Sequence, residues 1–233
     1  MQKFVIKPCG DTALMIQFEQ KIDPAVLREV RQMTEKIQNA HLKGIIDLIP
    51  SYAALLMKFD PVVFSYEMLK QKIEVLAKKA DRKTASAARY IDIPVLYGKP
   101  FPEDLEHVAK HAGCSVEEVI RIHTGNEYPV YMMGFLPGFP YLGNLDDRLH
   151  TPRRKEPRTS IPAGSVGIGG AQTGIYPLTS PGGWHILGLT PVKLYDPDAE
   201  DPVLLRSGDV IRFRSVSEEE FREIEEAGGK LCI

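Results

Sequence analysis

The chain changes character near residue 85, and this change constrains the fold more than any other feature. Before it, two amphipathic helical patterns alternate with short apolar runs. After residue 128, Gly or Pro interrupts the apolar runs every few positions, which is typical of a barrel or sandwich. Residues 81–89 contain no large apolar side chain and are expected to be a linker. We therefore predict a small α+β domain over 1–84 and a mainly β domain over 85–233.

The first domain is expected to follow the order ββαββα, with helices packed on a mostly antiparallel sheet. Asp23 and Pro24 predict a helix start, because an Asp oxygen can cap free amides and Pro fits the first turn. A second periodic stretch follows Ser65. The expected strands are 4–7, 12–18, 44–49 and 53–59.

The second domain is expected to open with a strand over 90–96 and two short helices at about 102–112 and 116–124. Ser115 and Glu118 form a capping box at the start of the second of these helices. A final helix is expected after Ser217. The remainder is predicted to be β structure.

Charge and composition exclude several classes of function. The net charge of -2 and the pI near 6.3 give no global field that would recruit nucleic acid or an acidic membrane. Neither an apolar run of 18 residues nor a signal peptide is found, so we expect a cytoplasmic location without membrane contact. Cys9, Cys114 and Cys232 are isolated, which predicts neither a disulfide framework nor a zinc site.

The segment 134–143 is the least ordinary in the chain. Glycines and prolines shape its backbone, and Phe135, Phe139 and Tyr141 offer flat apolar faces. Two interpretations remain open: a rigid aromatic loop that binds a ligand, or a loop whose aromatic rings plug the end of a barrel.

A basic stretch follows over 148–158. Arginine forks suit carboxylate and phosphate oxygens, so an anion site is one interpretation and a solvated surface is the other. Arg153 and Arg158 are the preferred candidates, because each lies beside a proline that restricts the loop.

The glycine-rich stretch 163–174 matches neither a dinucleotide-binding nor a P-loop motif. Its glycines, including Gly169 and Gly170 with the nearby Gln172, predict either tight β turns or an atypical loop of ligand-binding amides.

Trp184 and His185 form the last candidate pair, one a stacking wall and the other a group that can transfer protons. No acid at a diagnostic spacing completes a hydrolase triad, and a lone His is usually structural. His107 and His111 stand four apart on a predicted helix, but they fall opposite its apolar face. We expect both to be solvated and predict no metal site.

Several of these segments occur together in one order: 134–143, Pro152-Arg153, Arg158, 161–167 and 180–185. With the opening Gly10-Asp11-Thr12-Ala13-Leu14, they closely resemble the family of the 5-oxoprolinase B subunit, also described as kinase A inhibitor or allophanate hydrolase subunit 1-like, of the carboxyltransferase subdomain C/D type. The resemblance covers nearly the whole chain.

This resemblance implies a small α+β domain followed by a cyclophilin-like β-barrel. It also implies partners, because the B subunit acts with the A and C subunits in the ATP-dependent opening of 5-oxoproline to glutamate. ATP, with Mg, would enter through the complex, and the isolated chain would be inactive. Within the same family, the alternative is a binding module that inhibits a sporulation histidine kinase. Prolyl isomerisation is a third possibility, which no residue arrangement here supports.

The resemblance gives no assured catalytic assignment, so the individual roles are our inference. His185 is the candidate for moving a proton. The candidates for holding substrate or phosphate are Phe139, Tyr141, Arg153, Arg158, Gly169, Gly170, Gln172 and Trp184. We expect Arg153, Arg158, Gln172, Trp184 and His185 to converge on one cleft with the 134–143 loop.

Overall fold

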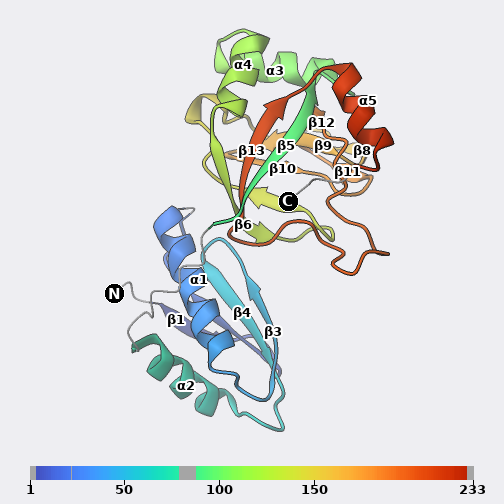
Figure 1. Cartoon of the computed structure of the whole chain (residues 1–233). Coiled ribbons are helices and arrows are strands. Elements are labelled where there is room, and N and C mark those ends of the chain that lie inside the picture. The colour runs from blue at the N-terminus through green and yellow to red at the C-terminus, as the bar shows by residue number, and fades with distance from the viewer. Residues whose placement is uncertain (1–3, 22, 79–87, 230–233) are drawn as a thin grey trace. The chain divides into compact units, whose positions relative to one another are not determined.

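The computed structural model describes residues 4–21, 23–78 and 88–229 (Figure 1). It divides the chain into two compact units, Met1–Ala87 and Ala88–Ile233. Among the described residues, no helix combines the length and the apolar character that a membrane crossing requires.

Of the predicted linker 81–89, only the last two residues lie in the described part of the chain, and Cys232 lies outside it. The division into two units leaves independent folding of each domain as a prediction.

The first unit is an antiparallel four-stranded sheet in the order β1-β2-β4-β3 with two helices, and the predicted order ββαββα is confirmed. Asp23 caps the first helix by accepting the Ala25 amide proton at 2.7 Å. Alternate strand residues such as Leu14 and Leu55 are fully buried in one apolar core with the helix faces. The elements are β1 (Val5–Pro8), β2 (Ala13–Gln17), α1 (Pro24–Asn39), β3 (Ile45–Pro50), β4 (Ala54–Phe59) and α2 (Tyr66–Lys78).

The second unit contains a closed barrel of seven strands in the order β10-β7-β6-β13-β5-β12-β9, which confirms the predicted β-barrel. Strands β5 and β13 pair in parallel, and the other barrel pairs are antiparallel. Strands β8 and β11 form a separate pair. The elements are β5 (Tyr90–Tyr97), α3 (Pro102–Ala112), α4 (Val116–Thr124), β6 (Glu127–Met133), β7 (Pro140–Leu142), η1 (Asp147–Leu149), β8 (Arg158–Ile161), β9 (Ser165–Gly169), β10 (Gln172–Ile175), β11 (Ser180–Gly182), β12 (His185–Leu189), β13 (Val210–Ser215) and α5 (Glu218–Glu226).

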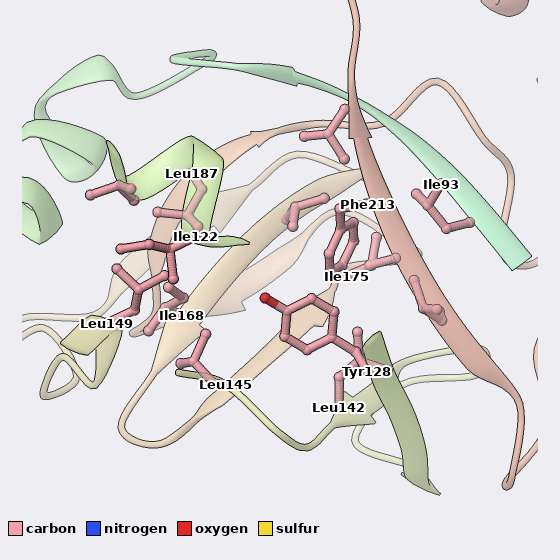
Figure 2. Close-up of a cluster of buried hydrophobic side chains, with 14 of the residues drawn as sticks. Ile93, Ile122, Tyr128, Leu142, Leu145, Leu149, Ile168, Ile175, Leu187 and Phe213 are labelled. Carbon is pink, nitrogen blue, oxygen red and sulfur yellow. The ribbon is translucent and has the colours of Figure 1, made fainter. Parts of the chain in front are cut away.

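The barrel interior is filled by aliphatic side chains around Tyr128 and Phe213 (Figure 2). The imidazole of His123 is fully buried beside them, and both of its ring nitrogens have a hydrogen-bond partner. Its Nδ1 lies 2.7 Å from the Tyr97 hydroxyl, and its Nε2 lies 3.0 Å from the Thr173 hydroxyl. Burial lowers the pKa of His123 to about 3, so the imidazole is neutral inside the barrel.

Helices α3 and α4 lie over one end of the barrel (Figure 1). Gly113 ends α3 with a φ of 67°, and the Ser115 hydroxyl caps α4 by accepting the Glu118 amide proton at 3.2 Å. The first turn of α3 packs against the start of β12.

Candidate functional site

An open cleft of about 570 Å³ lies on the second unit, where α3, the segment 152–156 and the start of β12 meet. Most of its side chains carry a charge or can take up a proton. It is lined by Glu103, Asp104, His107, His111, Pro152, Arg153, Arg154, Lys155, Glu156 and His185.

Asp104 forms the base of the cleft in the first turn of α3, and only 1% of its surface is exposed. Its carboxylate accepts hydrogen bonds from the Ile186 amide at 2.8 Å, from Arg154 Nη1 at 2.8 Å and from Arg158 at 2.5 and 3.0 Å. Burial alone would raise the pKa of this carboxyl, but His185, Arg158 and the Ile186 amide hold that pKa well below its usual range. Asp104 is therefore ionised and ties α3 to β12 and to the basic segment.

His185 begins β12 and is 5% exposed. Its Nε2 lies 3.1 Å from the Pro152 carbonyl oxygen, and because a carbonyl only accepts, Nε2 carries a proton. Its Nδ1 is buried without a hydrogen-bond partner among the described residues and lies 3.8 Å from Asp104 Oδ1. The carboxylate thus acts on Nδ1 through its charge. His185 is held in place from both sides and offers little surface to a ligand.

His107 lies over His185. The two rings stack with 4.4 Å between centroids and 10° between planes. His107 is exposed, and within the described ranges neither of its ring nitrogens has a hydrogen-bond partner. Burial, followed by the charges of His185 and His111, lowers the pKa of His107, although Asp104 acts in the opposite direction. At neutral pH this imidazole is therefore uncharged and can accept a proton.

Two cations of the cleft have no acidic partner in the part of the chain that the structure describes. Neither Arg153 nor Lys155 forms an ion pair with a described residue, and both side chains are exposed. The Arg153 guanidinium lies 5.9 Å from the centre of the Trp184 ring. Burial raises the pKa of Tyr141, and the charge of Arg153 acts against this shift. Because the nearby Asp104 is already paired with other arginines, these two cations are available to an anion.

Arg158 has a different position from the one expected of a ligand-binding group. Its guanidinium pairs with Asp104 and also with Glu103 at 2.9 Å, and it lies 3.8 Å above the centre of the Phe101 ring. Its side chain is 14% exposed. With its donors engaged in this way, Arg158 holds Asp104 in place rather than facing the cleft.

An aromatic cluster of buried rings supports the cleft. Phe139 and Trp184 meet edge to face at 5.7 Å between ring centres, and Tyr176 packs on both. A Cβ at Gly169 would overlap the Trp184 indole, so the absence of a side chain there admits the ring. Gly169 lies in strand β9, not in a turn, and ligand binding by the amides of this stretch stays a prediction.

The loop 134–143 combines a buried and an exposed aromatic ring. Phe139 is 2% exposed and packs in the cluster, whereas Phe135 is 62% exposed and has a φ of 68°. Phe139 thus packs in the aromatic cluster, whereas Phe135 is exposed. Ligand binding by this loop stays a prediction.

The expected convergence is partial. Arg153 and His185 line the cleft, Trp184 lies beneath Arg153, and Arg158 lies behind the cleft on Asp104. The remaining predicted residues do not line this cleft: Phe139, Tyr141, Gly169, Gly170 and Gln172. They lie instead in or beside β7, β9 and β10. Their roles in ligand binding stay predictions.

Sequence reasoning missed Asp104 and placed His107 only as a solvated residue. A signal for Asp104 was present, because this acid lies four positions before Val108 and next to Leu105 on the apolar face of α3. An acid at such a position requires buried partners. His107 is exposed as expected, but no local pattern in the sequence predicts its contact with His185.

Known proteins resemble this chain over most of its length. The family model "Carboxyltransferase domain, subdomain C and D" matches residues 4–205. The 5-oxoprolinase B subunit of Bacillus subtilis (strain 168) is 41% identical over 235 residues, which cover 96% of this chain and 98% of that protein. The 5-oxoprolinase B subunit of Escherichia coli O157:H7 is 40% identical over 207 residues, covering 88% and 92%.

Among solved structures, TTHA0988 matches with a TM-score of 0.78 and 36% identity over 91% of this chain. The match covers only 40% of the longer TTHA0988 chain. Together with the curated relatives, which match over almost their whole length, these similarities show that the chain belongs to the family of 5-oxoprolinase B subunits, with a carboxyltransferase C/D domain.

Proposed function

We propose that this chain is the B subunit of a multi-subunit, ATP-dependent 5-oxoprolinase, which opens 5-oxoproline to L-glutamate together with its A and C subunits. The observation that carries the proposal is the 41% identity to a 5-oxoprolinase B subunit over nearly the full length of both proteins. The charged side chains of the cleft are compatible with this reaction.

The negative charge of the substrate suits Arg153 and Lys155, the two cations of the cleft that form no ion pair with a described residue. 5-Oxoproline carries a carboxylate, and a phosphorylated reactant carries further anionic oxygens. Arg153 can present a planar fork to either group, and Lys155 adds a point charge. This pairing supports a role for the cleft in holding an anionic reactant.

A lactam is a poor electrophile, and ATP supplies a phosphoryl group that makes its carbonyl carbon more reactive. The cationic donors of the cleft, Arg153 and Lys155, suit a carboxylate or a phosphoryl group better than a complete Mg-nucleotide. Asp104 is engaged by arginines, and no group of three or more potential metal ligands was found among the described residues. We therefore propose that ATP and Mg enter through the assembled complex.

The length of TTHA0988 supports the proposal of partners. In that protein, a unit similar to this chain makes up 40% of one longer polypeptide. A unit that occurs fused to further chain is a good candidate for working beside separate subunits when it occurs alone.

The test is glutamate release from 5-oxoproline by the purified chain alone and by the chain reconstituted with the A and C subunits and ATP. We expect turnover only from the complete set. In that set, Arg153→Gln should raise KM for 5-oxoproline about tenfold or more, since a charge-assisted hydrogen bond contributes about 1.5–3 kcal/mol. The matched control is Arg222→Gln, because Arg222 is an exposed arginine of α5 outside the cleft-lining set.

Two results would contradict the proposal. Robust turnover by the chain alone would refute the subunit role. An inactive complete set that still blocks a histidine kinase would favour the inhibitor alternative.

A further inference from the structure

We propose that His107 is the catalytic residue of this cleft that exchanges a proton with the substrate, and that His185 is a positioning residue behind it. The inference rests on the proposed function and names a residue for it. It also revises the expectation that His185 itself transfers the proton.

Accessibility distinguishes the two imidazoles. His185 is 5% exposed, its Nε2 is occupied by the Pro152 carbonyl, and its Nδ1 faces the buried Asp104. His107 is exposed on the wall of the same cleft, and neither of its nitrogens is engaged by a described residue. A ligand in the cleft can therefore reach a ring nitrogen of His107 without displacing an existing hydrogen bond.

The stack explains how a surface histidine is held for chemistry. The parallel contact of 4.4 Å between ring centres restricts the rotation of the His107 ring. Asp104 fixes the layer beneath, because its carboxylate binds the amide of Ile186, the residue next to His185. His107 thus stands on a rigid, buried base, which is what a proton-transfer group needs.

The charges around His107 favour its neutral form. From its own helix, His111 and Asp104 act in opposite directions, and from β12 and the basic segment His185 and Arg154 oppose its protonation. The other charged or titratable groups that line the cleft are Glu103, Arg153, Lys155 and Glu156. A lowered pKa leaves His107 able to accept a proton at neutral pH.

His107 first accepts a proton from water and then returns it to the substrate. Water attacks the activated lactam carbon, its oxygen forms a bond to that carbon, and one water proton passes to the free nitrogen of His107. The ring C–N bond then breaks with its electron pair on nitrogen, and His107 delivers the proton to that nitrogen. The carbon re-forms its C=O bond as its hydroxyl proton passes to the released amine, which leaves an acyl phosphate. A second water attacks the carbonyl carbon of the acyl phosphate, and inorganic phosphate leaves to give the carboxylate of glutamate. The imidazole ends in its starting form.

The experiment uses the complex with the A and C subunits and measures kcat for glutamate release against pH. His107→Gln should lower kcat by about 10²-fold or more, as expected for loss of a general base. It should also remove the acidic limb of the profile, which is the fall of kcat as the pH is lowered. His185→Gln should retain the acidic limb, but the fall of kcat should begin at higher pH, because the variant removes a charge that opposes protonation of His107. The matched control, Glu106→Gln, changes an exposed residue of α3 that does not line the cleft and should leave kcat and its pH profile unchanged.

A second measurement does not depend on activity. In the histidine-labelled full chain, the NMR resonance that disappears in His107→Gln is assigned to His107. Titration of this resonance should give a pKa lowered from the usual value of histidine, and the pKa should be higher in His185→Gln than in the wild type. Unchanged Trp184 emission in each variant excludes misfolding of the surrounding cluster.

The outcomes separate the two proposals. A wild-type complex without turnover would refute the proposed function, and the role of His107 with it. An active wild-type complex in which His107→Gln retains kcat within about twofold, or keeps its acidic limb, would overturn this inference alone.

Discussion

Asp104→Asn is the most informative single change, because it removes one charge from a buried cluster while nearly preserving the shape of the side chain. The wild-type carboxylate accepts hydrogen bonds from Arg154, Arg158 and the Ile186 amide. An Asn side chain offers one accepting oxygen and places an NH2 group where a donor already points. The substitution therefore leaves Arg154 and Arg158 without the negative charge of Asp104. It also places the NH2 group of Asn opposite one of the groups that donate to Asp104.

The expected magnitude follows from burial. Removing one partner of a buried ion pair costs about 3–5 kcal/mol. The lower end applies here, because Arg158 keeps its contact with Glu103 and the Arg154 side chain is 30% exposed. We expect the free energy of unfolding of the second unit to fall by about 3 kcal/mol, which at a slope of about 2 kcal/mol/M moves the urea midpoint by about 1.5 M.

The assay is urea unfolding of the full chain followed by tryptophan emission. Trp184 is the only tryptophan and is 4% exposed in the second unit, so its emission reports on the unit that contains Asp104. The matched control is Asp92→Asn, which removes an Asp–Arg pair of similar geometry with Arg212 on the surface of the same barrel. Exposed pairs contribute little, so the control midpoint should hardly move.

The pH dependence gives an independent check. The pKa of Asp104 is lowered in the folded state, so its contribution is present above the pKa of an unfolded Asp and is lost as pH falls through the lower folded value. The gap between wild type and Asp104→Asn should therefore be full at pH 7 and shrink in strong acid. Equal midpoints for Asp104→Asn and the control at pH 7 would refute the role of Asp104 as an anchor.

Three further predictions concern the same unit. Gly169→Ala should cost about 1–3 kcal/mol by overpacking and shift Trp184 emission to the red, and unchanged emission and stability would contradict the packing role of this glycine. Since the pKa of His123 is about 3 when folded and about 6.5 when unfolded, the unfolded chain binds the extra proton between these values, and the free energy of unfolding should fall by up to about 1.4 kcal/mol per pH unit below 6.5. In urea titrations at several pH values, His123→Gln should lack this part of the slope, and an identical slope would contradict it. Residues 88–233 expressed alone should keep a cooperative urea transition of Trp184 emission, and its absence would contradict independent folding.

Local patterns in the sequence determined the elements. Asp23, Ser115 and Ser217 each cap the helix that was expected to follow them, because a cap joins atoms only two or three residues apart. Apolar periodicity likewise indicated which helix faces are buried. Arg153 could be chosen as a candidate because it lies beside Pro152, and His185 because it follows Trp184 and can transfer protons.

Tertiary structure alone decided how the barrel closes and what the cleft contains. The parallel pairing of β5 with β13 places Arg212 beside Asp92, although 120 positions of the sequence separate them. The sequence of neither strand indicates which strand it pairs with. The stack of His107 on His185 and the binding of Asp104 to Ile186 depend on that closure. Sequence spacing defines which atoms meet within a turn of helix or a hairpin, whereas contacts between distant segments form only when the packed core brings those segments together.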